Sequence, residues 1–528
     1  MLNFLLLSCL IVISLSALFS NVRQLQMLQQ NSYFAKRYFN WLKDSFSPNL
    51  AILCIVFCLG SLLFTKKLFI PLLVLYSVLL LVRIILCVRT HKKSIKKLVF
   101  TARIKRLFAT QILVLSGLNL LYAFFYDKLL GEICFIICVC ISAVSPLLTY
   151  ISWILTYPIE KLFARYYIND AKRILKRCDN LKVIGITGSY GKTTTKFILN
   201  RILSEKFNTV CTPQSFNTPM GVVRTVRSLI KADTQIFICE MGAKKRGDIK
   251  EICDIVKPTL SIITSVGPQH LDTFKSVENV YKTKFELFYA VKNAGGKTFV
   301  NAESKEILNR TDFSDTAIIP FALNGDYSYF AKDIVCSKLG SSFTLCLAGE
   351  EIKVTTKLLG LHAVSDILAA AAVAHYMGVT ADQIRFAVYS LKVTEHRLEL
   401  KPFFTKGLMI DDAYNSNPEG CLEAIRVLGS FEGMKKIIVT PGLIELGEKE
   451  YEANYNLGLE AAKYCDIIIL VGENRSKPMR DAIATTDFDK ENVFVVKSFA
   501  DAMTVCTPIV DSNTVVLLEN DLPDNYLN

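Results

Sequence analysis

The feature that most constrains the fold of this 528-residue chain is a glycine-containing loop between an apolar run and a helix. The run at 182–187 predicts a buried strand, residues 188–191 form the loop, and the Lys-Thr-Thr at 192–194 opens a helix. Backbone N–H groups in such a loop hold phosphate oxygens, and the helix N-terminus adds positive potential. We therefore expect Lys192 to reach the β- and γ-phosphates of a nucleotide, and the Thr193 hydroxyl to bind Mg²⁺.

The loop departs from the strict phosphate-binding pattern at one position. That pattern has glycine where this chain has Ile186, and the glycines stand instead at 185, 188 and 191. The alternative interpretation is a glycine-rich turn that binds no ligand. Lys192 followed by three threonines favours a phosphate site over that alternative.

The first part of the chain is predicted to lie in a membrane. Hydrophobic residues make up 51% of the chain and concentrate in five segments, at 3–20, 50–65, 69–88, 107–126 and 129–150. Most of these approach the roughly 20 residues that cross a bilayer as a helix. We therefore expect about five transmembrane helices within 1–157. Residues 1–20 lack a basic start and a small-residue cleavage site, which argues against a cleaved signal peptide.

The distribution of charge sets the expected orientation. Residues 1–180 hold 22 Lys and Arg against 6 Asp and Glu, whereas the remainder holds 39 against 42. The basic excess therefore flanks the apolar segments and does not indicate nucleic-acid binding. Its distribution predicts a multi-pass cell-membrane protein with its N-terminus outside and its catalytic domains in the cytoplasm. Residues 158–179 predict an interfacial linker helix. Arg83 and Glu132 lie inside apolar segments; we favour side chains near the interfaces, and the alternative is a functional charge within the membrane.

Beyond the loop, polar side chains follow predicted strands. Glu240 ends the apolar run 235–239, and His270 comes shortly after the run 260–264. Because the carboxyl ends of parallel strands meet at one edge of a sheet, Glu240 is well placed as a Mg²⁺ ligand beside the loop. From residue 399 onward, strand-like runs alternate with helical stretches, which predicts a second α/β domain with a parallel sheet.

Several of these segments together resemble the Mur ligase family of ATP-dependent peptidoglycan-precursor ligases. The matching segments are 187–194, 216–221, 240–242, 267–271, 282–288, 360–362 with the alanine-rich 368–374, 395–399 and 411–418. The resemblance covers roughly 180–528. It implies an α/β fold in which the membrane region is followed by a P-loop-type central domain at 180–398 and a C-terminal Rossmann-like domain at 399–528.

The resemblance also implies roles for individual residues. The expected catalytic residues are Lys192, Lys284, His270 and Arg397. The expected Mg²⁺ ligands are Thr193, Glu240, His270 and Lys284, the last after carbamylation turns the lysine into a carboxylate; the alternative for Lys284 is a solvated lysine on a helix face. The expected ATP contacts are Gly188, Ser189, Gly191, Lys192, Thr193, Thr194, Asp366, Arg397, Asp412 and Asn415. The expected substrate contacts are Asn217, Thr218, Tyr414 and Asn417.

One helix departs from the family pattern. Where the family's adenine-reading helix typically carries two asparagines, this chain has Ala363 and Asp366. We expect Asp366 to accept a hydrogen bond from the adenine amino group instead. The departure puts strict preference for ATP among nucleotides in question.

The resemblance implies an ATP-dependent acid–amino-acid ligase that works through an acyl phosphate and adds D-alanyl-D-alanine or a similar amine to a peptidoglycan precursor. Its partners would be a small-molecule or lipid-linked carboxylate acceptor, an amine donor, membrane lipids and cell-wall synthesis proteins. Apolar segments stand where the family has a domain for the UDP-sugar, which leaves open another amide polymer such as poly-γ-glutamate. A third hypothesis is a membrane scaffold that binds a nucleotide without catalysis.

Overall fold

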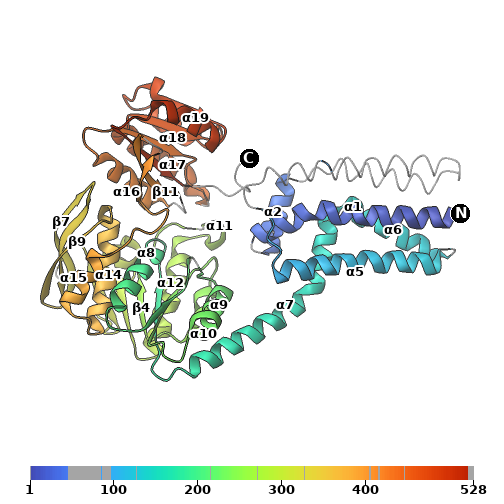
Figure 1. Cartoon of the computed structure of the whole chain (residues 1–528), viewed down its shortest axis with the longest axis horizontal. Helices are drawn as coiled ribbons and strands as arrows, with labels where there is room; N and C mark the ends of the chain where they lie inside the picture. The colour runs from blue at the N-terminus through green and yellow to red at the C-terminus, as the bar shows by residue number, and fades with distance from the viewer. Residues whose placement is uncertain are drawn as a thin grey trace. The chain divides into compact units, whose positions relative to one another are not determined.

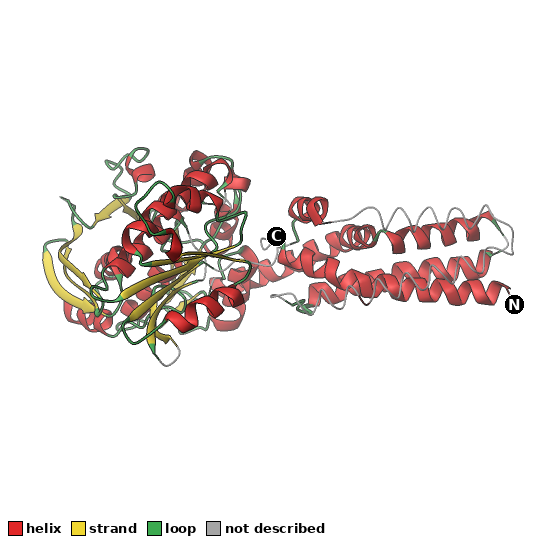
Figure 2. Ribbon diagram, turned by 90° about the horizontal axis from the view of Figure 1, so that it is seen from above, coloured by secondary structure: helices red, strands yellow, loops and turns green. Residues whose placement is uncertain are grey.

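The computed structural model describes residues 2–31, 33–45, 85, 97–126, 128–214, 216–269, 271–325, 327–403, 406–413, 417–444 and 446–520. Residues Met1–Arg165 form one compact unit, and Tyr166–Leu522 form a second, larger one. The described part of the first unit is helical, and both sheets belong to the second unit (Figure 1). Figure 2 shows the same division, with the strands confined to the second unit.

The first unit contains helices α1 (Leu2–Gln30), α2 (Ala35–Ser45), α5 (Ala102–Phe125), α6 (Leu129–Ala143) and the start of α7 (Ser145–Lys176). Among the described residues, two stretches are long and apolar enough to span a membrane, Leu10–Gln30 and Ala102–Phe125. These correspond to the predicted segments 3–20 and 107–126. The predicted segments 50–65 and 69–88, with Arg83, lie outside the described residues apart from Ile85, so the number of crossings stays a prediction.

The predicted apolar segment 129–150 is not one helix. Helix α6 ends at Ala143, and α7 begins at Ser145 after Val144 leaves the helical region, with φ −104° and ψ 70°. Pro146 contributes to the break, because its nitrogen has no N–H to donate to the carbonyl one turn earlier, whereas a proline is well tolerated in the first turn of a new helix. Conversely, the predicted linker 158–179 is not a separate helix, because α7 continues through Pro158 to Lys176.

The larger sheet has nine strands in the order β2-β3-β1-β4-β5-β6-β7-β8-β9. All neighbours from β2 to β7 pair in parallel, and β7, β8 and β9 form antiparallel pairs. The strands are β1 (Lys182–Thr187), β2 (Thr209–Cys211), β3 (Ile236–Glu240), β4 (Leu260–Ile263), β5 (Lys297–Asn301), β6 (Ile318–Ala322), β7 (Tyr329–Ser337), β8 (Gly340–Leu347) and β9 (Glu350–Thr356).

Helices pack against this sheet in two separate hydrophobic clusters. One cluster includes α8 (Lys192–Leu203), α14 (Gly360–Tyr376) and α15 (Ala381–Tyr389); the other includes α9 (Pro219–Leu229), α10 (Asp248–Val256) and α12 (Val277–Asn293). The alanines at 369–372 in α14 are buried, and their small side chains let that helix approach the sheet closely. The short helices α11 (Leu271–Phe274) and α13 (Lys305–Leu308) lie in the connections.

The smaller sheet has six strands in the order β10-β11-β15-β12-β13-β14, and only β10 is antiparallel to its neighbour. The strands are β10 (Glu399–Phe403), β11 (Gly407–Asp412), β12 (Lys435–Thr440), β13 (Ile467–Val471), β14 (Val493–Val496) and β15 (Thr514–Glu519). The helices are α16 (Pro418–Gly429), α17 (Glu450–Tyr464), α18 (Lys477–Ile483) and α19 (Phe499–Ile509), with 3-10 turns η1 (Gly447–Lys449) and η2 (Lys490–Asn492). Two sheets rich in parallel strands confirm the expected α/β class.

Candidate functional site

The predicted glycine loop joins β1 to α8 at the carboxyl end of β1, which lies between β3 and β4 in the larger sheet. Gly191 precedes α8 with φ 76°, a left-handed conformation that favours glycine. A Cβ at this position would lie 2.5 Å from Oδ1 of Asp366. The loop therefore needs glycine at 191 for its backbone angle and for the close approach of α14.

The chain itself fixes the shape of this loop. The amides of Ser189 and Tyr190 donate to the carbonyl and the hydroxyl of Ser265, at 2.8 and 2.9 Å. The Ser189 hydroxyl donates to the carbonyl of Gly267 at 3.1 Å, and the Tyr190 hydroxyl donates to that of Pro268 at 3.1 Å. Because these donors are already used, the amides available to phosphate are those of the first turn of α8, which includes Thr194 and has no intrahelical acceptors.

Lys192 lies against its own loop. Its ammonium donates to the carbonyls of Gly188 and Ser189 at 2.7 and 3.0 Å. Burial lowers the pKa of Lys192 to about 8, with Glu240 opposing the shift and Arg397 adding to it. The side chain is thus held at the loop by contacts that phosphate oxygens would replace.

Glu240 is the centre of the polar network beside the loop. It ends β3, next to β1, and its side chain is only 1% exposed. Its Oε2 accepts from the Thr193 hydroxyl and from the Lys196 ammonium, each at 3.0 Å, and its Oε1 accepts from the Asn217 amide at 3.0 Å. Burial alone would raise the pKa of Glu240, but the nearby lysines and the amide together lower it. The carboxylate is therefore charged at neutral pH.

The sequence analysis missed Lys196. Its side chain is completely buried, and besides Glu240 it donates to the carbonyl of Gln214. Its position one helical turn after Lys192 was the available signal, since residues four apart share a helix face. Lys196 thereby connects the carboxylate of Glu240 to the segment that carries Asn217.

The oxygens of Thr193 and Glu240 fit a magnesium ion. Both are hard oxygen ligands, they lie 3.0 Å apart, and the carboxylate is ionised. Within the described ranges, no group of three His, Cys, Asp or Glu side chains could hold a metal ion. His270, the third expected ligand, lies outside the described residues. The described members of the expected metal site are thus Thr193, Glu240 and, after its expected carbamylation, Lys284.

Lys284 is buried in α12 rather than solvated. Only 1% of its surface is exposed, which contradicts the alternative of a lysine on an open helix face. Burial, reinforced by the charge of Lys192, lowers its pKa well below the ordinary value. Both effects favour a neutral amine, which is the form that reacts with carbon dioxide to give a carbamate. The carbamylation itself stays a prediction.

Asp366 lies beneath the start of α8. Its Oδ1 accepts from the Thr195 hydroxyl at 2.7 Å. Burial raises the pKa of Asp366 to about 7, although Thr195, Arg397 and Lys192 oppose the shift. The adenine contact expected of this residue stays a prediction.

Arg397 lies in the connection to the second sheet, and Asp412 is the last residue of β11. His396 and Leu398 have φ angles of 57° and 46°, which non-glycine residues rarely adopt. Asp412 accepts from the Leu398 amide at 3.2 Å, and burial raises the pKa of Asp412 while Arg397 opposes the shift. The charge of Arg397 also lowers the pKa of Lys192 and that of Asp366, so the guanidinium is close enough to interact electrostatically with the loop.

The expected substrate contacts have other partners in the structure. Thr218 and Asn417 are the N-caps of α9 and α16, where they accept from the amides of Gly221 and Gly420 at 3.3 and 2.8 Å. Asn217 donates to Glu240, as described above. Tyr414 and Asn415 lie outside the described residues. The substrate roles of all these residues stay predictions.

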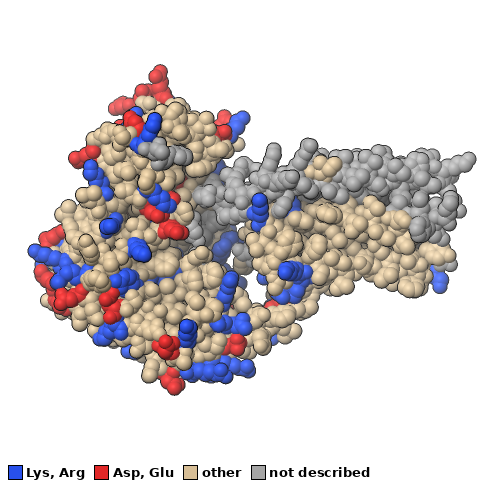
Figure 3. All heavy atoms as spheres, in the orientation of Figure 1, with Lys and Arg blue, Asp and Glu red and all other residues tan. Residues whose placement is uncertain are grey.

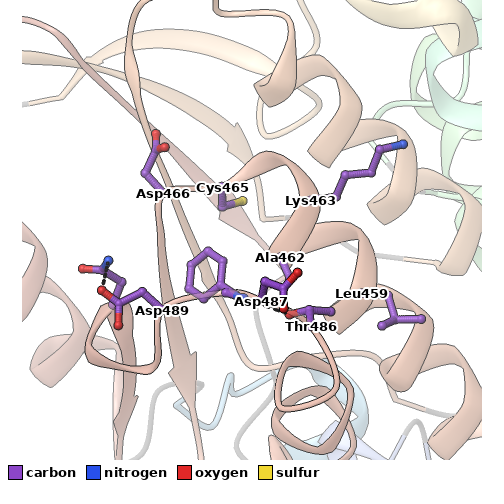
Figure 4. Close-up of a pocket in the computed structure, with 10 residues that line it drawn as sticks. Leu459, Ala462, Lys463, Cys465, Asp466, Thr486, Asp487 and Asp489 are labelled. Atoms are coloured by element: carbon purple, nitrogen blue, oxygen red, sulfur yellow. Dashed lines mark hydrogen bonds between the residues drawn. The ribbon is translucent and has the colours of Figure 1, made fainter.

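A separate cavity of about 620 Å³ lies in the C-terminal sheet domain, between the end of α17 and the segment before β14. Figure 4 shows its lining, which includes Cys465, Asp466, Asp487 and Asp489. Asp466 immediately precedes β13, so the cavity is at the amino ends of the parallel strands. The phosphate loop and Glu240 are at carboxyl ends of strands, where ligands bind in such sheets. The cavity is therefore not part of the candidate site.

Two domain families match the chain. Residues 186–374 match the Mur ligase middle domain, and residues 396–519 match the family described as Mur ligase, glutamate ligase domain. Together the two matches account for more than half of the chain.

The curated relatives carry the same kind of name. The chain is 32% identical over 271 residues to the UDP-N-acetylmuramoyl-tripeptide–D-alanyl-D-alanine ligase of Buchnera aphidicola, which covers 51% of this chain and 58% of the relative. It is 31% identical over 270 residues to the enzyme of that name from Bacillus subtilis, with coverage of 51% and 58%. The chain thus spans less than two thirds of the length of these relatives.

A solved structure, the MurF ligase of Thermotoga maritima in complex with ADP, superposes with a TM-score of 0.60. The superposition covers 69% of this chain and 81% of that one, at 23% sequence identity. At this identity the likeness shows the fold.

Proposed function

Because this chain belongs to the Mur ligase family, we propose that its second unit is an ATP-dependent ligase that joins a carboxylate to an amine through an acyl phosphate. The observation that carries the proposal is the convergence of Lys192, Thr193 and Glu240 at the carboxyl ends of two neighbouring strands. This arrangement unites a phosphate-binding loop, a cationic side chain and an ionised buried carboxylate. It is what transfer of a phosphoryl group requires from a protein, namely positioning and charge neutralisation.

The first step transfers the γ-phosphoryl group of ATP to the acceptor. A carboxylate oxygen forms a bond to the γ-phosphorus, the bond to the bridging oxygen breaks, and ADP leaves. The amides of the first turn of α8 bind the phosphate oxygens, and the Lys192 ammonium lies beside them to neutralise charge. Held by Thr193 and Glu240, Mg²⁺ would neutralise the charge that develops on the transferred group.

The second step forms the amide. The nitrogen of the amine attacks the acyl carbon, inorganic phosphate leaves, and the amine loses a proton. Because water would hydrolyse the acyl phosphate, the site has to exclude it. The left-handed residues His396 and Leu398 mark the connection at which the C-terminal domain is expected to move onto the central one.

We propose D-alanyl-D-alanine, or a similar amine, as the nucleophile and a peptidoglycan precursor as the acceptor. The names of the relatives support this choice of substrates. The match covers about half of this chain, so this support applies only to the part of the chain that the relatives share. Poly-γ-glutamate synthesis keeps the chemistry and changes the substrates. A non-catalytic scaffold is the alternative of another class, and the charged, buried Glu240 beside Lys192 argues against it.

We also propose that the first unit anchors the ligase in a membrane, with its N-terminus outside and the catalytic unit in the cytoplasm. The stretch Ala102–Phe125 supports this, because only 22% of its apolar window is buried, whereas a core helix of a water-soluble protein would be mostly buried. Retention in the membrane pellet after alkaline extraction checks the proposal. Release into the supernatant would contradict it.

The activity is tested with the purified full chain in detergent, ATP, Mg²⁺ and an acceptor with or without the amine. UDP-N-acetylmuramoyl-tripeptide is one acceptor, and its undecaprenyl-linked counterpart is the other. We expect ADP release only when acceptor and amine are both present, with loss of release in Lys192→Met. ADP release that is independent of both substrates would contradict a ligase, and the acceptor that supports release identifies the linkage.

A further inference from the structure

The first unit has large apolar side chains on its outside, and its mostly apolar interior also contains buried polar side chains. Phe19, Leu113 and Phe124 are 58%, 71% and 77% exposed, whereas Asn21 and Thr149 are completely buried. Polar contacts cross between helices in the interior: Asn119 donates to Ser14 at 3.1 Å, and Thr149 donates to Asn21 at 3.3 Å. Helices that pack within lipid show this pattern, because polar groups there bond to one another and apolar groups face the acyl chains.

Charged residues begin at one common level of this bundle. Helix α1 has no charged residue before Arg23, and α5 has none after Arg106, so each uncharged stretch is about 30 Å long at 1.5 Å per residue. Gln29 and Val99 exchange two hydrogen bonds at 2.8 and 3.0 Å, and Arg106 donates to Glu160 of α7 at 2.6 and 2.9 Å. The ends of the uncharged stretches in three helices therefore meet at one side of the bundle, and about 30 Å matches the hydrocarbon core of a bilayer.

Aromatic side chains gather at this level, and we call them the aromatic belt. The belt consists of Phe39 and Trp41 from α2 and Tyr150, Trp153 and Tyr157 from α7, and the ring of Tyr38 is buried beneath it. The rings contact each other within and between the helices, with centroids 5.1 Å apart for Phe39 and Tyr150, 6.0 Å for Tyr150 and Trp153, and 5.4 Å for Trp153 and Tyr157.

Basic side chains flank the belt. The guanidinium of Arg103 lies 3.8 Å from the centre of the Tyr33 ring, and the ammonium of Lys161 lies 4.7 Å from that of Tyr157. On the face that Figure 3 shows, the Lys and Arg side chains of this unit gather mostly at one end, and much of the remaining described surface carries no charge. Rings with polar edges next to cations fit the boundary between acyl chains and anionic headgroups.

We propose that the aromatic belt and its flanking basic side chains form the surface at which the first unit meets the anionic headgroups of the cytoplasmic leaflet. The inference rests on the proposed membrane location and adds the depth at which the unit sits. A lipid surface fits this level better than an acidic protein does, because the belt directly adjoins about 30 Å of exposed apolar helix.

Both tryptophans of the chain, Trp41 and Trp153, are members of the belt, so tryptophan emission, excited at a wavelength that the 21 tyrosines do not absorb, reports on the belt alone. We would reconstitute the protein in phosphatidylcholine–phosphatidylglycerol vesicles with a nitroxide quencher either near the headgroup or deep in the acyl chain. We expect greater loss of emission with the shallow quencher, in the wild type and in each of Trp41→Phe and Trp153→Phe. We also expect the shallow quencher to reduce the emission more when it is attached to phosphatidylglycerol than when it is attached to phosphatidylcholine. The reason is that each basic side chain near the surface raises the local concentration of an anionic lipid by up to about fivefold.

The matched control moves the reporter toward the middle of the bilayer. In a chain with Trp41→Phe and Trp153→Phe, Leu113→Trp places a tryptophan on the exposed face of α5, and the deep quencher should then act more strongly. Stronger deep quenching of the native tryptophans would overturn the belt while leaving the membrane location intact. Absence of quenching by either lipid, in the native chain and in the control, would overturn both. Ligase turnover is measured separately, so a failure here is distinct from a failure of the proposed activity.

Discussion

The buried pair of Lys196 and Glu240 gives the sharpest test of the site. The two side chains are 0% and 1% exposed, and Nζ lies 3.0 Å from Oε2. At that distance and an effective dielectric constant of about 20, the attraction is of the order of 5 kcal/mol before the cost of desolvation. Removing one partner leaves the other charge buried and uncompensated, which typically costs about 3–5 kcal/mol.

Lys196→Met and Glu240→Gln are each expected to lower the free energy of unfolding by that amount. In thermal unfolding of the full chain in detergent, without nucleotide, this corresponds to a decrease in Tm of about 5 °C for a unit of this size. The double variant should be destabilised by much less than the sum, with a coupling of about 2 kcal/mol or more. A pair that merely happens to be close would give additive effects.

The matched control is the surface pair of Lys257 and Asp254, which has a similar distance of 3.1 Å but side chains that are 74% and 55% exposed. Lys257→Met is expected to change stability by less than about 1 kcal/mol, because water screens the pair. The reasoning is refuted if Lys196→Met leaves Tm unchanged, or if the two single effects at the buried pair add up in the double variant.

The remaining predictions concern three other positions. Burial raises the pKa of Asp366 to about 7, so between about pH 4 and pH 7 the folded chain keeps a proton that the unfolded chain has released. The stability of the wild type should therefore fall as the pH rises through this range. Asp366→Asn should remove this fall in a plot of Tm against pH and should stabilise the chain at pH 8 by a few kcal/mol. An Asp366→Asn chain with an unchanged profile contradicts this. Gly191→Ala should lower stability by about 1–3 kcal/mol and weaken ATP binding. Gly247 is also left-handed but has open space around it, so Gly247→Ala should cost only the strain of the backbone angle. Equal losses of stability in the two variants would count against the close approach of Asp366. Lys284→Ala should lose most of its turnover and recover part of it with added acetate, because the added carboxylate replaces the carbamate. In the wild type, ¹³C-bicarbonate should give a carbamate NMR signal that Lys284→Arg lacks. If active wild-type enzyme gives no such signal, carbamylation is excluded.

The sequence predicted the α/β class and the phosphate loop because both depend on local patterns. The runs before Gly188 and Glu240 are short, apolar and followed by polar residues, and these became β1 and β3 with their carboxyl ends side by side. In the C-terminal domain, the predicted alternation of strand-like runs and helical stretches includes the apolar runs 436–439 and 467–471, which correspond to β12 and β13. Such patterns show which residues are buried in the sheet, and they can be read from the sequence without knowledge of tertiary contacts.

Features that depend on tertiary contacts could not be read in this way. Lys196 has the sequence context of any helical lysine, and only the pairing of β3 with β1 brings Glu240 to its ammonium. The resemblance implied a substrate role for Asn417, which stays a prediction; that its side chain caps α16 follows from where the helix begins, which the resemblance did not give. The segment 129–150 looked continuous by hydropathy, but Pro146 has no N–H to continue helix α6 and lies instead in the first turn of α7.

The most direct test of the central claim follows an oxygen atom. The full chain is supplied with ATP, Mg²⁺, D-alanyl-D-alanine and UDP-N-acetylmuramoyl-tripeptide whose terminal carboxylate carries ¹⁸O, and the inorganic phosphate is analysed by mass spectrometry. An acyl phosphate intermediate predicts that each phosphate released with ADP contains one oxygen from the acceptor. Unlabelled phosphate, or AMP and pyrophosphate as products, would contradict the account.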